Sequence, residues 1–249
     1  MPRGPDRRPS RPKTPQGVRP HRSAKTSGDT ERSPSRYEPV HLDDELTREL
    51  RATARPGKGD IMVKVFADAM AAFTAGDLDE AIRLGEQCKH IALRSVPARE
   101  FLGLAYYHAG RWQEAARELA AFRRLSGSNE QNHVIADSYR AMGKAEKAVE
   151  IVDQVDPRKV EAPVYYEAQI VGAGALADLG RVEEAVERLR KLNLKPPTAE
   201  AHHIRAWYVL GDLLERTGRF TQAREWFEAV DSADPDATDA SERINRLKG

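Results

Sequence analysis

Five times in this chain a helix-like, partly apolar stretch ends at a glycine and restarts at an alanine five residues later. The frames are Gly76 to Ala81, Gly110 to Ala115, Gly143 to Ala148, Gly180 to Ala185 and Gly218 to Ala223. Successive glycines are 34, 33, 37 and 38 residues apart. Repeats of this length are typical of stacked helical hairpins, so most of the chain is predicted to be one repeated unit.

The two small residues of each frame have separate roles in such a hairpin. Glycine ends a helix by taking the left-handed conformation that closes its last turn, which a residue with a Cβ reaches only at an energetic cost. Alanine begins the apolar face of the second helix, where the two helices approach closely and a larger side chain would force them apart. We therefore expect one helix before each glycine and another around each alanine.

The last copy carries the fullest pattern around its frame. Its aromatic, small and turn residues are Trp207, Leu210, Gly211, Gly218, Phe220, Ala223, Phe227 and Pro235. These residues resemble the tetratricopeptide repeat, whose pattern places Trp, Leu-Gly, Gly, an aromatic, Ala, an aromatic and Pro at these intervals. The resemblance covers about residues 60–235, with looser matches in the earlier copies. It implies an all-α fold, a solenoid of about five helix-turn-helix repeats.

The chain divides into four predicted parts. Residues 1–40 form a disordered basic arm, residues 41–57 a leading helix and linker, residues 58–235 the five repeats, and residues 236–249 a C-terminal capping helix. The predicted helices run approximately over 43–54, 60–75, 78–92, 97–109, 112–125, 130–142, 145–155, 161–179, 182–192, 198–217, 220–232 and 236–248.

The N-terminal arm differs in charge from the rest of the chain. Residues 1–38 hold seven of the fifteen prolines and ten Lys or Arg against four acidic residues, so their net charge is +6 and the remainder carries −5 of the total +1. So few of these residues are apolar that burial cannot offset the entropy of ordering them. The arm is a solubilising extension, a segment that pairs loosely with the acidic body, or a polycation for nucleic acid, an anionic surface or an acidic partner. Its candidate phosphate contacts are Arg7, Arg8, Arg11, Lys13, Arg19, Arg22 and Lys25.

In the repeat that this chain resembles, the first helix of each hairpin builds the inner wall of the solenoid. The wall positions lie 13, 10, 6 and 3 residues before each frame glycine, and they are apolar at the N-terminal end and mainly acidic further on. The candidate partner-binding residues on this wall are Val63, Phe66, Met70, Phe73, Leu104, Tyr107, His133, Asp137, Arg140, Tyr208 and Asp212. The leading helix, with leucines at 42, 46 and 50, either covers the apolar end as a cap or leaves it open to a helix or hydrophobic peptide.

One function known in the family is disfavoured by the residues on this wall. Relatives that hold the acidic C-terminal tails of chaperones use Lys, Asn and Arg as a clamp for carboxylates at the positions 10 and 6 residues before the glycine. The second repeat has Glu100 and Leu104 there, and the third has His133 and Asp137. An acidic wall would repel an anionic peptide.

No catalytic or metal-binding motif accompanies the repeats. The sequence has no Gly-rich phosphate loop, no Gly-x-Ser-x-Gly elbow, no His-Glu-x-x-His pair and no cysteine cluster. His202 and His203 are neighbours, which point about 100° apart on a helix and cannot readily share a metal. Cys88 is the single cysteine, which excludes an intramolecular disulfide and fits a reducing compartment.

These features favour a non-catalytic, cytoplasmic scaffold of bacterial type, without a cofactor, that binds a protein or peptide segment in the groove of the solenoid. No apolar run is long enough to be expected to span a membrane. The alternative is a nucleic-acid- or ribosome-associated accessory protein whose basic arm contacts phosphates. The partner and the oligomeric state stay open at this point.

Overall fold

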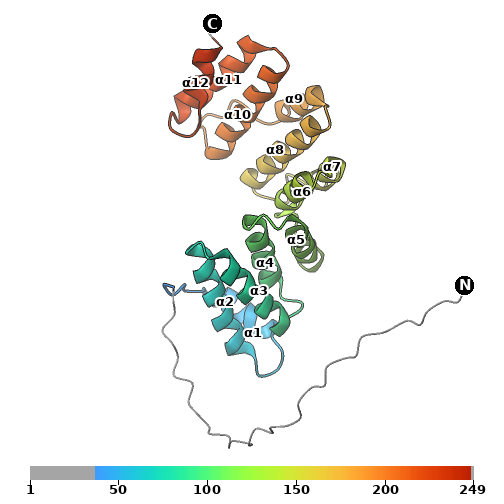
Figure 1. The fold of residues 1–249 in the computed structure, drawn as a ribbon, viewed down its shortest axis with the longest axis vertical. Helices are drawn as coiled ribbons and strands as arrows, with labels where there is room; N and C mark the ends of the chain where they lie inside the picture. Colours follow the sequence, from blue (N-terminus) through green and yellow to red (C-terminus); the bar gives the residue numbers. More distant parts are fainter. Residues whose placement is uncertain (1–36, 248–249) are drawn as a thin grey trace, which may run out of the picture. The chain divides into compact units, whose positions relative to one another are not determined.

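The computed structural model describes residues 37–247, and these residues form twelve helices and no strand. Helix α1 (Asp44–Thr53) comes first, followed by five helical hairpins and a short last helix (Figure 1). The helices are α2 (Gly59–Thr74) with α3 (Leu78–Ile91), α4 (Val96–His108) with α5 (Trp112–Ser126), α6 (Asn132–Ala141) with α7 (Ala145–Val152), α8 (Ala162–Asp178) with α9 (Val182–Arg190), α10 (Ala201–Arg216) with α11 (Phe220–Ala233), and α12 (Ala240–Arg246). The predicted all-helical fold is confirmed, and the predicted arm lies outside the described residues apart from its last four.

The turns inside the hairpins repeat one backbone geometry. All five frame glycines lie in the left-handed region, with φ between 71° and 78°. In each turn the residue after the glycine donates its N–H to a carbonyl five residues earlier, as Arg111 does to Tyr106 at 2.9 Å. This bond closes the last turn of the first helix. The frame alanines are all 0% exposed, so both roles predicted from the sequence are confirmed.

Further glycines let the two helices of a hairpin cross closely. A Cβ built on Gly103 would lie 2.5 Å from Cγ of Leu119 on the next helix. One built on Gly211 would lie 2.9 Å from the ring of Phe227. Real Cβ atoms do not approach that closely, so α4 and α10 can pack against their partners only with glycine at these positions.

Packing follows the order of the chain. Each helix contacts the one before and the one after it, and the first helices of successive hairpins also touch, α4 with α6, α6 with α8 and α8 with α10. Three clusters of buried apolar side chains run through the stack. The row of first helices therefore forms the inner wall that the repeat resemblance implies.

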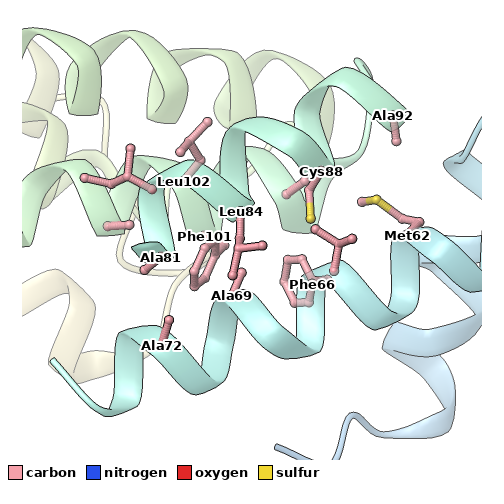
Figure 2. Close-up of a cluster of buried hydrophobic side chains, with 14 of the residues drawn as sticks. Met62, Phe66, Ala69, Ala72, Ala81, Leu84, Cys88, Ala92, Phe101 and Leu102 are labelled. Carbon is pink, nitrogen blue, oxygen red and sulfur yellow. The ribbon is translucent and has the colours of Figure 1, made fainter. Parts of the chain in front are cut away.

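The first of these clusters lies between α2, α3 and α4 (Figure 2). Phe66, Leu84 and Phe101 point toward one another there. Cys88 is 0% exposed in the same cluster, and burial raises the pKa of its thiol to about 12. Its thiol is therefore protonated at neutral pH and packs as a small apolar group.

Several helices are shorter than predicted, among them α6, α7, α10 and α12. Helix α7 ends at Val152 rather than near residue 155, because Val155 turns inward and is only 6% exposed in the core. Helix α12 begins at Ala240 rather than near residue 236. The chain from Asp234 to Thr238 instead makes a turn whose side chains line a cavity against α10.

Candidate functional site

A cavity of about 390 Å³ opens on the inner wall where four first helices meet. Helix α4 contributes Tyr107, α6 contributes His133, Asp137 and Arg140, and α10 contributes Arg205. The remaining lining comes from Val134 of α6 and Glu167, Ile170 and Val171 of α8. The structure thus brings together four of the eleven residues expected to line the groove.

Arg140 and Asp137 form the centre of this cavity. Arg140 donates from Nη1 to Asp137 at 3.0 Å and from Nε to Asp178 at 2.9 Å. The hydroxyl of Tyr107 donates to the second oxygen of Asp137 at 2.6 Å. A Cβ at Gly174 would lie 2.7 Å from the guanidinium carbon of Arg140, so a larger residue there would require the guanidinium to shift. Burial and the bond to Asp137 raise the pKa of Tyr107 to about 12.

The other side of the cavity holds a second ion pair and an unsatisfied histidine. Nη2 of Arg205 lies 2.8 Å from Oε2 of Glu167. Burial raises the pKa of Glu167, and the positive charge of Arg205 opposes that rise. Nδ1 of His133 is buried and has no hydrogen-bond partner among the described residues. Burial lowers the pKa of His133, so its ring is neutral at pH 7.

An apolar cavity of about 310 Å³ adjoins the polar one and shares Ile170 and Arg205 with it. Its other lining residues are Ala201, Ile204, Tyr208, Val209, Asp234, Ala237 and Thr238. We call the two cavities together the inner-wall groove. Ile204 and Val209 were not predicted from the sequence. Their cavity is formed between α10 and the turn before α12, and this contact could not be foreseen from the repeat spacing.

The C-terminal helix occupies the wall next to this apolar cavity. Arg243 of α12 pairs with Asp212 at 2.8 Å and with Glu215 at 2.6 Å. Tyr208 donates to Asp239 at 2.7 Å and accepts a hydrogen bond from Arg243 at 3.2 Å. Asp212 is therefore committed to an internal ion pair, whereas Tyr208 still lines the apolar cavity.

At the N-terminal end of the wall, Phe66 lies in the core. It is 3% exposed, and its ring packs edge to face with Phe101 at a centroid distance of 5.5 Å (Figure 2). It is therefore not available to a partner. Val63, Met70 and Phe73 are partly buried against the same cluster, and Leu104 against the next one.

The leading helix α1 packs onto the first repeat. Leu50 is 0% exposed, and Leu42 and Leu46 are partly buried against the same cluster as Phe66. Arg51 pairs with Asp60 at the start of α2, at 3.1 Å. Of the two alternatives for this helix, these contacts favour the cap over the beginning of α2.

Two carboxylates of the wall, Glu100 and Glu130, lie near a third, Glu49 of α1. Burial is the largest cause that raises the pKa of Glu100 on α4. The nearby charges of Glu130 and Glu49 raise it further. Gln131 donates to Glu100 at 2.8 Å. Within residues 37–247, no cation forms an ion pair with any of the three.

A larger cavity, about 600 Å³, lies away from the inner wall between α7, α8 and α9. Its floor includes Val152 and Leu176, and its rim carries charges of both signs. Arg188 fills part of it and is bound to Asp153 at 2.5 Å and to Gln169 at 3.1 Å. Its volume exceeds that of either cavity of the groove, and most of its charged lining residues are already paired with one another or with a neighbour.

The two neighbouring histidines considered in the sequence analysis pack inside the fold. His202 and His203 are 7% and 6% exposed and pack with Tyr166. No group of three or more His, Cys, Asp or Glu in residues 37–247 could hold a metal ion. Within the same range, no helix is both long and apolar enough to cross a membrane. The seven basic residues proposed for phosphate contact lie outside the described residues.

Comparison with known proteins agrees with this geometry. Two models of the tetratricopeptide repeat match the chain, over residues 96–121 and 172–238. No curated protein sequence matches it. A putative kinesin light chain of Podosopora anserina with nearly identical TPR-like repeats superposes with a TM-score of 0.60 at 21% identity, covering 82% of this chain and 100% of that one.

Two further solved structures share the fold. A thermophilic TPR protein of Thermus thermophilus superposes with a TM-score of 0.56 at 17% identity, covering 75% of this chain and 98% of that one. YrrB, a TPR protein with an unusual peptide-binding site, superposes with a TM-score of 0.51 at 17% identity, covering 73% of this chain and 90% of that one. The recurring glycine turns, the buried frame alanines and the two matching models identify tetratricopeptide repeats in this chain, over residues 96–121 and 172–238.

Proposed function

We propose that this protein is a non-catalytic scaffold that binds a segment of a protein partner in the inner-wall groove. The observation that carries the proposal is the pair of adjoining cavities, one polar and one apolar, that share Ile170 and Arg205 on the row of first helices. Such a pairing suits a peptide, because an apolar pocket supplies anchoring while fixed polar groups set its orientation. The peptide-binding site named for YrrB supports the same reading at the level of the fold.

In this proposal the partner segment lies along α6, α8 and α10. An apolar side chain of the segment enters the cavity at Ile204 and Val209, where burial of its surface drives association. Polar groups of the segment meet Tyr107, Arg140 and Arg205, which are held in place by neighbouring carboxylates. Because these side chains are already oriented, little conformational entropy is lost on binding.

A paired substitution tests the proposal. Ile204→Arg with Val209→Arg fills the apolar cavity with charge, and proteins captured from a lysate of the source organism by the full chain should be lost with this variant. The matched control is Leu93→Arg with Phe220→Arg, since these side chains are 55% and 54% exposed outside the groove. Thermal unfolding by circular dichroism checks that both variants fold. Equal capture by the parent and the folded groove variant would reject the proposal.

The charge of the N-terminal residues favours a second candidate, an accessory protein associated with nucleic acid or the ribosome. Residues 1–38 carry +6 against −5 for the rest of the chain. Phosphate binding through this arm would weaken by roughly 0.7 to 0.9 log units per log unit of salt for each phosphate neutralised. Loss of RNA binding on deleting residues 1–38 would support this candidate, and retention would reject it.

A further inference from the structure

Negative charge exceeds positive charge on the inner wall. Its charged positions are Glu100, Glu130, Asp137, Glu167, Asp212 and Glu215 against Arg140 and Arg205. Helix α12 compensates Asp212 and Glu215 through Arg243. The excess therefore lies outside the two cavities, at Glu100 on α4 and at Glu130 just before α6.

The two arginines of the wall are already occupied by carboxylates. Arg140 is held by Asp137 and Asp178, at 3.0 and 2.9 Å, and Arg205 is held by Glu167 at 2.8 Å. An anionic segment would have to displace one of these pairs to find a positive partner, and it would leave a carboxylate behind. Removing one member of a partly buried pair costs more than the new contact returns.

Glu100 and Glu130 differ from these two arginines, because neither forms an ion pair within residues 37–247. Among residues 37–247, Glu100 accepts a side-chain hydrogen bond only from the neutral Gln131, and its charged neighbours Glu130 and Glu49 are carboxylates too. Like charges close to the half-buried Glu100 repel it, so a cation placed among them relieves that repulsion. In the described part of the chain, the wall thus offers uncommitted acceptors for cationic groups, while both of its arginines are paired with carboxylates.

We propose that the occupant of the inner-wall groove is a basic segment of a protein partner, with lysine or arginine against Glu100 and Glu130 and an apolar side chain in the cavity at Ile204 and Val209. This inference rests on the proposed function and specifies the chemistry of the partner. Charge complementarity selects the segment and speeds its association, while the apolar side chain supplies most of the anchoring.

Three model peptides of about 14 residues, four helical turns, test the inference on the full chain. They share the same leucine positions and carry lysine, glutamine or glutamate at all remaining positions. Fluorescence anisotropy should show the lysine peptide binding at least about tenfold more tightly than the glutamine peptide, with an affinity that falls as salt is added. The glutamate peptide should bind most weakly.

Two variants separate the charge from the apolar anchor. Glu100→Gln with Glu130→Gln should weaken the lysine peptide about tenfold and leave the glutamine peptide unchanged. Ile204→Arg with Val209→Arg should weaken both peptides. Glu146→Gln, an exposed carboxylate on α7 outside the groove, is the matched charge control and should change neither affinity.

The outcomes distinguish the inference from the proposed function. If the glutamate peptide binds as well as the lysine peptide and the Ile204 and Val209 variant weakens it, the groove binds segments but the charge assignment is overturned. If the lysine peptide binds equally to the parent and to both groove variants, its binding lies elsewhere and both the inference and the proposed function fail.

Discussion

At the scale of single residues, the close crossing of two helices in a hairpin depends on glycines that no larger residue can replace. Gly103→Ala would place a Cβ 2.5 Å from Cγ of Leu119 and 3.2 Å from its backbone nitrogen. Because Leu119 is 0% exposed and packed on all sides, it cannot move away without displacing other core side chains. We expect a loss of about 1–3 kcal/mol in the free energy of unfolding, measured by urea denaturation.

The control for this substitution is Gly143→Ala, where the added Cβ meets nothing within 4 Å. Its cost comes from backbone conformation alone, since φ is 71°, and should be about 1 kcal/mol. Equal losses for the two variants would mean that crowding at Gly103 is not what fixes the crossing.

The buried carboxylate of Glu118 leads to a second prediction at this scale. Glu118 is 1% exposed and pairs with Lys89, Arg99 and Arg117. Burial alone would raise its pKa, but the hydrogen bond from Arg99 and the charge of Lys89 outweigh it, so the pKa of Glu118 is lowered. Glu118→Gln leaves three cations without their shared carboxylate and should cost about 3 kcal/mol at neutral pH.

The pH dependence of that loss follows from the lowered pKa. Stability from the Glu118 charge is present above its unfolded value near 4.5 and is lost as pH falls through the lower folded pKa. The difference between parent and Glu118→Gln should therefore shrink as urea denaturation is repeated at pH values below about 4.5. A difference that stays constant with pH, or one matched by the exposed control Glu146→Gln, would contradict this account.

At the scale of elements, the start of α10 depends on the neutral form of a histidine. The N–H of Glu200 donates to Nδ1 of His203 at 3.1 Å, which caps the helix. Burial and the neighbouring His202 lower the pKa of His203, and Tyr166 packs against both rings. Protonation would place a proton on the accepting nitrogen, so the cap bond requires the neutral ring.

The stability that this cap provides should therefore depend on pH. It is complete above the unfolded pKa of about 6.5 and is lost as pH falls through the lower folded value. We expect hydrogen exchange in the first turn of α10 to accelerate in that range, and His203→Asn, which accepts the same bond without titrating, to remove the acceleration. His90→Asn, at an exposed histidine, serves as the control and should leave it unchanged.

The elements also show what the sequence could and could not predict. Helix ends at the frame glycines were predictable, because a left-handed residue closes a helix wherever it occurs. Four groove residues on α4 and α6 were predictable from their spacing before those glycines. The burial of Phe66 and the pairing of Asp212 were not, because their partners Phe101 and Arg243 lie 35 and 31 residues further along the chain.

At the scale of the whole molecule, stability comes from the stacking of neighbouring repeats, so local damage should stay local. Helix α12 packs on α11, and its Ala240 and Ile244 are 2% and 6% exposed in the core cluster that they share with α10 and α11. Arg243 lies over the ring of Phe227, 4.7 Å from its centroid. Deleting residues 236–249 would expose this cluster and leave Glu215 without its cation.

We expect this deletion to lower the stability of α10 and α11 by about 3 kcal/mol, from lost burial and from the uncompensated carboxylate of Glu215. Hydrogen exchange should accelerate in those helices and stay unchanged in α2 to α5, because the N-terminal repeats keep all their neighbours. Arg246→Ala is the control, since its side chain is 61% exposed and its pair with Glu215 contributes little. Equal acceleration along the whole chain would instead mean that the repeats unfold as a single unit, and that the stack does not behave as a row of semi-independent hairpins.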